Sequence, residues 1–149
     1  MGERSTPVPP LAGWLMILGG AALAMLTFVD WYEFFGEGVN AWQTLRRTDV
    51  AIFVAGIVAG ACGAWLLFGD VGPERRVVAP FGALAAGLGA IVVFVRMVSP
   101  PADLPLKFGI YLALAAALAA TVGGVIATRS TFGSPRPPTP AGPEPLGDR

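Results

Sequence analysis

The chain has 149 residues, of which 54% are hydrophobic and only 13% are charged, and its acidic and basic residues balance. Because an average soluble protein carries about 25% charged residues, this composition leaves few polar side chains to cover a soluble domain. The zero net charge and the lack of a basic stripe predict no nucleic-acid partner. Histidine is absent, which removes the usual proton shuttle and the commonest metal ligand.

Four long apolar segments organise the chain, and they cover residues 11–29, 50–68, 77–98 and 108–128. Each has about 19 to 22 residues, and a helix needs roughly 20 to cross the hydrocarbon of a bilayer. We therefore predict an all-α integral membrane protein, with a four-helix transmembrane bundle over residues 11–128. The lipid bilayer is its first expected partner.

The first apolar segment follows a polar lead, residues 1–10, and contains the motif Ala22-Leu23-Ala24. This motif has the small-x-small form of a signal-peptide cleavage site. However, the apolar run is longer than the about 7 to 15 residues of a signal peptide, and prolines stand where its basic region would be. We therefore predict a retained membrane anchor.

Aromatic residues flank this first segment, with Trp14 near one end and Trp31 and Tyr32 just past the other. Such positions fit the aromatic belt of membrane proteins, where a ring is half in lipid and half solvated.

The longest loop, residues 30–49, is the richest in chemistry. Gly36 and Gly38 are expected to interrupt regular structure. Asn40, followed three residues later by a glutamine, resembles a helix N-cap. Apolar residues then recur at helical spacing, at Val39, Trp42 and Leu45. We predict a short amphipathic helix here, lying on the membrane surface.

The same loop contains aromatic and charged residues that suit contact with a partner: Trp31, Tyr32, Glu33, Trp42, Arg46 and Arg47. Its three carboxylates, on Asp30, Glu33 and Glu37, offer the oxygen ligands that divalent cations prefer, although their spacing matches no recognised calcium loop. A solvated acidic rim over an aromatic belt is the favoured interpretation. The two arginines and Asp49 are expected to pair with these acids and fold the loop onto the helix ends.

The other connections are short or rich in proline. Residues 69–76 form a tight turn, and the three prolines of residues 99–107 prevent a continuous helix there. Residues 129–149 contain many prolines and few apolar residues, so we predict a disordered cytoplasmic tail. Its prolines could also dock on a partner as a polyproline II helix.

Small residues at a spacing of four recur within the apolar segments. In lipid, such residues allow helices to approach closely, because burying leucine provides no driving force there. The candidate helix-packing residues are Gly56, Gly60, Gly87 and Gly124. Packing within one chain is favoured, and a homo-oligomer interface is the alternative.

The centres of the four segments lack ionisable side chains. Arg96 comes closest, and its long side chain can reach the interface or pair with Asp103 or an acid of the long loop. No serine or cysteine has a histidine to activate it, and no phosphate-binding glycine motif stands in a strand–turn–helix setting. We therefore predict no catalytic residues, cofactor or metal site.

Four crossings place both termini on one side of the membrane. The basic residues expected on that side are Arg4, Arg75, Arg76, Arg129, Arg136 and Arg149, and those on the other side are Arg46, Arg47, Arg96 and Lys107. Because basic residues concentrate in the cytoplasm, we predict a multi-pass protein of the cell membrane with both termini cytoplasmic.

One pattern joins the first two apolar segments: Trp-Tyr follows the first, and Ala-Trp-Gln and an acidic residue precede the second, at Trp31, Tyr32, Ala41, Trp42, Gln43 and Asp49. This pattern is similar to that of small, uncharacterised four-span membrane proteins of actinobacterial type. The resemblance implies a bacterial four-span protein and carries no activity with it. The tryptophan-containing first loop also resembles claudin-like proteins in architecture, but the paired loop cysteines of that group are missing.

These observations favour a non-enzymatic membrane protein that acts through helix or loop contacts, as an accessory subunit or small scaffold for a membrane-protein partner. The alternative is a small transporter or channel for an apolar or lipid-like solute, which would need a cavity lined by the glycine and alanine faces. A membrane enzyme that binds a metal through the loop carboxylates is a more remote option.

Overall fold

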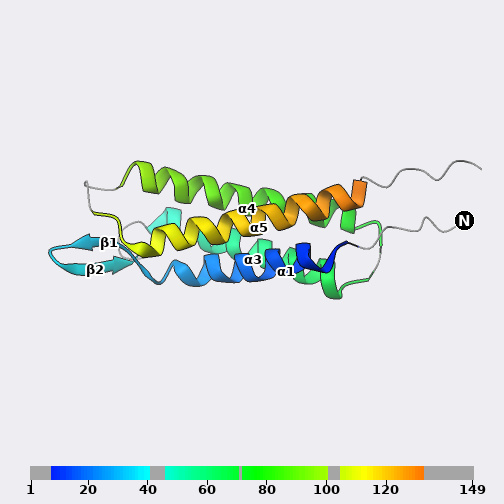
Figure 1. Ribbon diagram of the computed structural model, residues 1–149, viewed down its shortest axis with the longest axis horizontal. Helices are drawn as coiled ribbons and strands as arrows, with labels where there is room; N and C mark the ends of the chain where they lie inside the picture. The colour runs from blue at the N-terminus through cyan, green and yellow to red at the C-terminus, as the bar shows by residue number, and fades with distance from the viewer. Residues whose placement is uncertain (1–7, 41–45, 71, 101–104, 133–149) are drawn as a thin grey trace, which may run out of the picture.

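A computed structural model of the protein describes residues 8–40, 46–70, 72–100 and 105–132. Within those residues, four helices lie side by side along one long axis (Figure 1): α1 (Pro10–Leu26), α3 (Arg46–Phe68), α4 (Arg75–Val98) and α5 (Phe108–Phe132). Two short strands, β1 (Asp30–Phe34) and β2 (Glu37–Asn40), pair antiparallel in a hairpin that projects beyond one end of the helices (Figure 1).

The helices form an antiparallel bundle in which each contacts two main neighbours. Helix α1 packs against α3 and α5, and α4 packs against the same two helices from the opposite side. The described chain therefore begins and ends at one end of the bundle, called here the terminal end, and the hairpin marks the other end (Figure 1). The predicted helical bundle is confirmed, but "all-α" omits the hairpin.

Three of the described helices are long and apolar enough to cross a membrane, over Thr48–Phe68, Arg75–Val98 and Phe108–Phe132. Helix α1 is also apolar but has only 17 residues. Length and composition therefore support a membrane protein with three candidate spans, and α1 is a shorter apolar helix beside them.

Helix α1 ends three residues before the predicted boundary at residue 29. Its last turn is closed by local hydrogen bonds: the Thr27 hydroxyl donates to the carbonyl of Ala24 at 2.7 Å, and the Trp31 indole N–H donates to the carbonyl of Leu26 at 2.7 Å. These side chains satisfy carbonyl groups that a continuing helix would have bonded. The chain can therefore turn toward the hairpin at this point.

Helix α5 continues four residues into the segment predicted to be a disordered tail, so that prediction is wrong for residues 129–132. The hydroxyls of Ser130 and Thr131 donate to the carbonyls of Ile126 and Thr128, at 2.9 and 2.8 Å. No glycine or proline lies between residues 125 and 132, so nothing in this stretch ends the helix earlier. The rest of the predicted tail, residues 133–149, lies outside the described residues.

The prediction that Gly36 and Gly38 interrupt regular structure is confirmed at Gly36, which separates the two strands, and is wrong at Gly38. Gly38 lies within β2, and Gly36 forms the two-residue turn of the hairpin together with Phe35. Both turn residues have positive φ, 50° at Phe35 and 83° at Gly36. This sign pattern belongs to the type I′ turn, whose twist matches that of the flanking strands. Glycine therefore permits the hairpin here.

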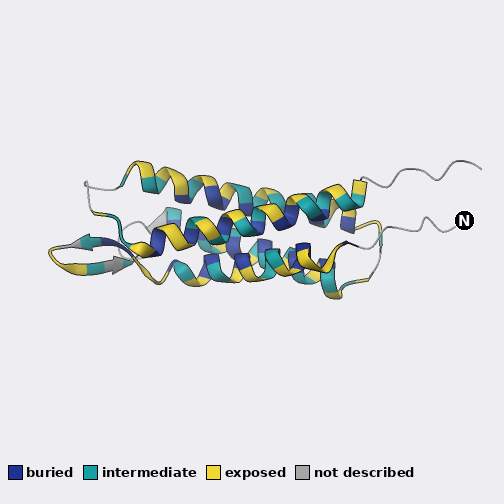
Figure 2. Ribbon diagram, in the orientation of Figure 1, coloured by how far each residue is buried: buried dark blue, intermediate teal, exposed yellow. Residues whose placement is uncertain are grey.

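Figure 2 shows that each helix has an exposed and a buried side. Many large apolar side chains are exposed, while the buried residues of the helices are mostly alanine and glycine, with some larger side chains such as Leu23 and Ile110. The exposed residues include one leucine or isoleucine from each helix, namely Leu18, Ile57, Leu88 and Leu118. The centre of the bundle contains a fully buried cluster of three alanines, Ala59, Ala86 and Ala120. A soluble bundle would bury most of its large apolar side chains, because their burial stabilises folding in water.

Glycines bring α1 and α3 into backbone contact. A Cβ added at Gly20 would lie 2.5 Å from the carbonyl oxygen of Gly56 and 2.6 Å from the backbone nitrogen of Gly60. A Cβ at Gly124 of α5 would lie 2.6 Å from the Cα of Ala83 in α4. At Gly87, by contrast, the nearest atom would be a methyl of Thr121 at 3.9 Å, an ordinary contact. A Cβ at Gly60 would likewise meet its nearest atoms at 3.8 Å, whereas one at Gly56 would lie 2.7 Å from the carbonyl oxygen of Gly20. Two of the four candidate packing glycines, Gly56 and Gly124, thus leave no room for a side chain.

Candidate functional site

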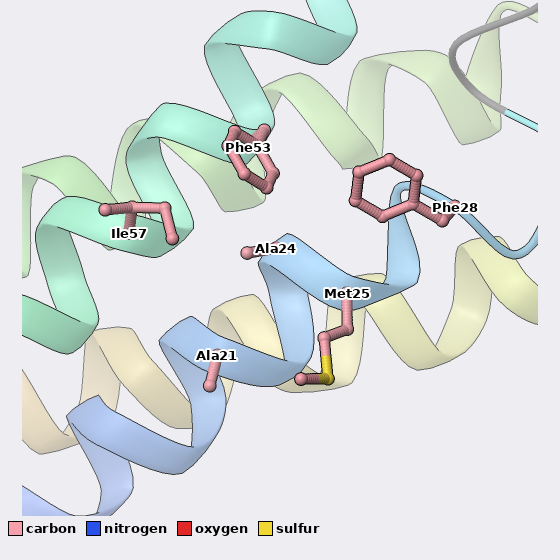
Figure 3. A pocket seen from close by; sticks show the side chains of 6 residues that line it. All are labelled: Ala21, Ala24, Met25, Phe28, Phe53 and Ile57. Atoms are coloured by element: carbon pink, nitrogen blue, oxygen red, sulfur yellow. The ribbon is translucent and has the colours of Figure 1, made fainter.

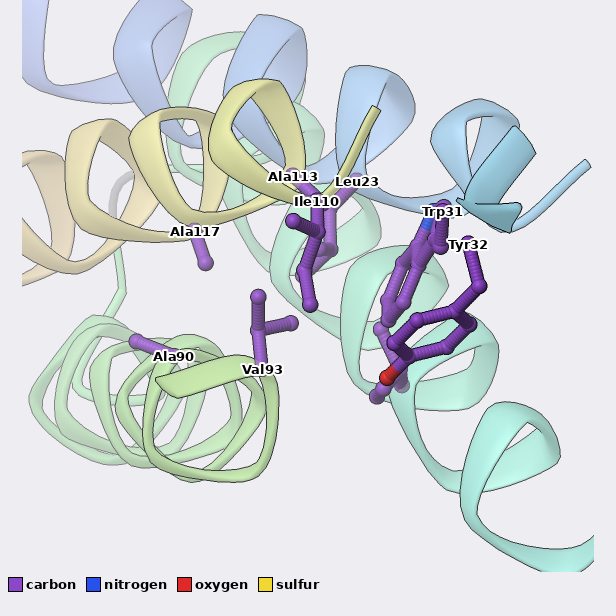
Figure 4. Packing of buried hydrophobic residues seen from close by; sticks show 9 residues of the cluster. Leu23, Trp31, Tyr32, Ala90, Val93, Ile110, Ala113 and Ala117 are labelled. Atoms are coloured by element: carbon purple, nitrogen blue, oxygen red, sulfur yellow. The ribbon is translucent and has the colours of Figure 1, made fainter. Parts of the chain in front are cut away.

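The hairpin is held on the bundle by Trp31 and Tyr32, which are each only 1% exposed. Adjacent residues of a regular strand point to opposite faces, so the burial of both is unusual. The pairing register shifts between Asp30 and Tyr32, which leaves Trp31 as an extra residue on β1. Such a bulge redirects side chains, and Figure 4 shows both rings extending from the hairpin toward the helices.

Trp31 fills the end of the bundle between α1 and α5. Its ring belongs to a buried cluster with Leu23 and Ile110 (Figure 4). A Cβ on Gly109 would lie 3.2 Å from the indole Cδ1 and 2.5 Å from the carbonyl oxygen of Asp30, so glycine lets the start of α5 approach β1. The Trp31 carbonyl also accepts a hydrogen bond of 2.8 Å from the backbone N–H of Lys107.

Tyr32 reaches the ends of α3 and α4, where several polar groups meet. Its hydroxyl donates to the backbone carbonyl of Arg96 at 3.4 Å, and the guanidinium of Arg96 donates to the hydroxyl of Thr48. Asp49 is buried beside this group. Burial raises the pKa of the Tyr32 phenol; the charge of Arg96 acts to lower it, and that of Asp49 adds to the increase. The phenol is therefore held in its neutral form.

The segment before α5 braces the outer side of β1. Leu106 forms an antiparallel bridge with Tyr32, and the backbone N–H of Glu33 donates to the carbonyl of Pro105 at 3.1 Å. The carboxylate of Glu33 lies 3.8 Å from the Lys107 ammonium, and both side chains are partly exposed. An ion pair of this kind contributes about 0 to 1 kcal/mol, so the backbone bonds provide most of the bracing.

The candidate interaction residues are only partly brought together. Trp31, Tyr32 and Glu33 form the base of the hairpin, whereas Trp42 and the predicted surface helix after Asn40 fall on residues 41–45, outside the described residues. Arg46 and Arg47 begin α3 at the same end of the bundle. The expected aromatic belt does not include Trp31 and Tyr32, because their rings are buried within the protein.

Sequence reasoning missed the tip of the hairpin. Phe35 is 93% exposed, and its φ of 50° lies in the left-handed region that non-glycine residues rarely adopt. The adjacent Gly36 was the available signal, since a glycine between two runs of strand-forming residues indicates a hairpin turn. Thr48, which accepts the Arg96 hydrogen bond, was also missed, and no sequence motif marks it.

An apolar groove of about 230 Å³ opens on the outside of α1 and α3, close to the hairpin end (Figure 3). It is lined by Ala21, Ala24, Met25, Phe28, Phe53 and Ile57. The rings of Phe28 and Phe53 meet edge to face there, with centroids 6.0 Å apart. Its apolar lining suits a hydrocarbon chain rather than a polar ligand.

The described residues contain no group of three or more cysteine or acidic side chains placed to hold a metal ion. The loop carboxylates are spread instead, with Glu33 beside Lys107 and Glu37 exposed on β2. What the described site offers is a rigid hairpin base, a protruding aromatic tip and an outward apolar groove. Comparisons with protein-family models, curated proteins and solved structures find no match to this chain.

Proposed function

We propose that the chain is an integral protein of the cell membrane that crosses the bilayer four times. The support is the large number of exposed apolar residues on all four described helices, around a centre that contains a buried cluster of alanines. In water, an apolar surface this continuous would drive association. With 17 residues, α1 is at the lower limit of about 17 to 25 residues for a spanning helix.

Both termini would face the cytoplasm and the hairpin would lie outside the cell. By the sequence, the two terminal segments and the 69–76 connection contain six of the basic residues, and the other segments contain four. This bias favours a cytoplasmic terminal end. Fusions of a cytoplasmic reporter to each end should both be active, and activity at one end alone would contradict the topology.

The function we propose within this membrane is that of a non-enzymatic accessory subunit or small scaffold, which contacts a membrane-protein partner through the hairpin. The observation that carries it is Phe35, an exposed aromatic side chain in a left-handed conformation on a hairpin braced by Trp31 and Tyr32. Strained backbone of this kind costs about 1 to 3 kcal/mol and concentrates at functional sites. A rigid, protruding aromatic residue is also a common anchor in protein interfaces.

Site-specific crosslinking tests the proposal. A photoreactive phenylalanine analogue at position 35 should form one discrete adduct with a partner in native membranes, whereas the same analogue at the outward-facing Leu118 should label lipid. Excess purified wild-type protein should compete for the adduct, and the Phe35→Gly variant should not. Equal competition by the variant would refute the hairpin as the contact site.

A second candidate is a transporter or channel for an apolar or lipid-like solute, which the groove between α1 and α3 favours. Against it, the glycine and alanine faces that would line a central pathway are in contact with one another, as at Gly20 and Gly56. A flux assay in vesicles separates the candidates, because the accessory role predicts no flux above that of empty vesicles.

A further inference from the structure

Two tryptophans lie on neighbouring helices at the terminal end of the bundle. Trp14 is near the start of α1 and Trp65 is near the end of α3, and these helices run antiparallel, so the rings are at a similar level. Trp14 is 47% exposed and Trp65 is 52% exposed. The Trp14 ring also packs edge to face on Phe68, with centroids 6.2 Å apart. These three residues are called the tryptophan patch.

The patch lies where the apolar helix surface gives way to a tightly held polar connection. The nearly buried guanidinium of Arg75 donates to the carbonyls of Gly69 and Asp70, at 3.0 and 3.3 Å, and so closes the end of α3. A Cβ on Gly69 would lie 3.2 Å from two atoms of the Trp65 indole, so this ring lies against the last turn. The indoles therefore stand within one turn of the polar boundary.

The hairpin end of the bundle differs from the terminal end in its aromatic residues. Trp31, the tryptophan described there, is sealed inside the protein and bonded to the Leu26 carbonyl. The exposed aromatic side chains near this end of the described helices include three phenylalanines, Phe28, Phe94 and Phe108, and Tyr111, but no tryptophan. An indole differs from phenyl because its N–H can bond to water or lipid ester groups while its ring stays in hydrocarbon.

From this asymmetry we infer that Trp14 and Trp65 anchor the terminal end of the bundle in the headgroup and glycerol layer of the bilayer, on the α1–α3 side, and that Trp31 has no contact with lipid. The ligand of the patch is thus a phospholipid interface rather than a protein. This inference rests on the proposed membrane insertion.

Fluorescence quenching by brominated lipids tests it on the full-length chain in phosphatidylcholine vesicles. Trp42, which lies outside the described residues, is replaced in all samples. The Trp42→Phe protein retains Trp14, Trp31 and Trp65, and a second protein with Trp14 and Trp65 also replaced by phenylalanine retains Trp31. Bromines near the glycerol should quench the first protein more strongly than bromines at the end of the acyl chain, and neither lipid should quench the second.

Each other outcome has a distinct meaning. Stronger quenching by the deep bromines, or equal quenching of the Trp31 protein with its helix content intact, would overturn the anchor. So would the absence of quenching in protein that stays with the vesicles after an alkaline wash, since another protein or a second copy would then cover the patch. Release of both proteins by the wash would instead refute the membrane insertion itself.

Discussion

In the middle of the bundle the core consists of Ala59, Ala86 and Ala120, whereas at the hairpin end it contains the rings of Trp31 and Tyr32. The two regions are held together differently. Small residues allow backbones to touch in the middle, as at Gly20 and Gly56, while large side chains with hydrogen bonds fill the space under the hairpin.

This difference matches the surroundings proposed for each region. Inside lipid, burying a large apolar side chain brings no gain, so close packing of small residues has to hold the helices. At the membrane surface water is present, and burying an indole becomes favourable again. The following substitutions test this comparison, beginning with the largest expected effect.

Replacing Trp31 with alanine should destabilise the protein most, by about 3 to 5 kcal/mol, because it empties a buried aromatic site and leaves the Leu26 carbonyl without its indole partner. Unfolding by sodium dodecyl sulfate in mixed micelles, followed by circular dichroism, measures the loss. Phe35→Gly is the matched control, since it removes an exposed aromatic side chain from the same hairpin. Equal losses in the two variants would mean that Trp31 does not hold the hairpin on the bundle.

In the middle of the bundle, Gly20→Ala should cost about 1 to 3 kcal/mol, because the new methyl meets backbone atoms of Gly56 and Gly60 that cannot move aside independently. The same unfolding titration applies. Gly87→Ala provides the control, as its methyl would make only an ordinary contact with Thr121. A bundle that accepts both alanines equally well would not depend on glycine contact between α1 and α3.

Tyr32→Phe should have a smaller effect, about 0.5 to 1.5 kcal/mol, because it removes one hydrogen bond and keeps the buried ring. The bond to the Arg96 carbonyl is long, at 3.4 Å, which places the expected loss near the lower value. If Tyr32→Phe cost as much as Trp31→Ala, the polar group around Arg96 would be more important than ring burial for holding the hairpin.

The smallest effect should appear only at alkaline pH. The folded-state pKa of Tyr32 is raised. The stability that the neutral phenol provides is therefore complete below the unfolded pKa of about 10, and it is lost as pH rises through the folded pKa. Absorbance of phenolate in a Tyr111→Phe background should therefore appear above pH 10, and stability should fall in the same range. The decline should be absent in Tyr32→Phe, and ionisation at the ordinary pKa would contradict the burial of this ring.

The apolar helices could be predicted from the sequence because a run of about 20 apolar residues has few alternatives. The helix ends were harder to predict from the sequence. Arg46 and Thr131 are compatible with either helix or loop, and local hydrogen bonds decide which of the two they adopt. The pairing of Gly56 and Gly60 with Gly20 needs the helices to be placed side by side, although each spacing is visible in the sequence.

Two features prevented the hairpin from being predicted from the sequence. Its turn, Phe35-Gly36, lacks the Asn-Gly or Asp-Gly signature of a type I′ turn. The bulge at Trp31 also breaks the alternation that marks a strand, because Trp31 and Tyr32 are buried together. The same two aromatics fit an interfacial belt equally well, and sequence alone cannot distinguish a ring in lipid from a ring under a hairpin.

The unequal lengths of the helices have a consequence for the surrounding lipid. At 1.5 Å per residue, the 17 residues of α1 measure about 26 Å and the 25 residues of α5 about 38 Å. A bilayer around this molecule would have to be thinner beside α1 than beside α5, and that deformation costs fractions of a kcal/mol per Å of mismatch.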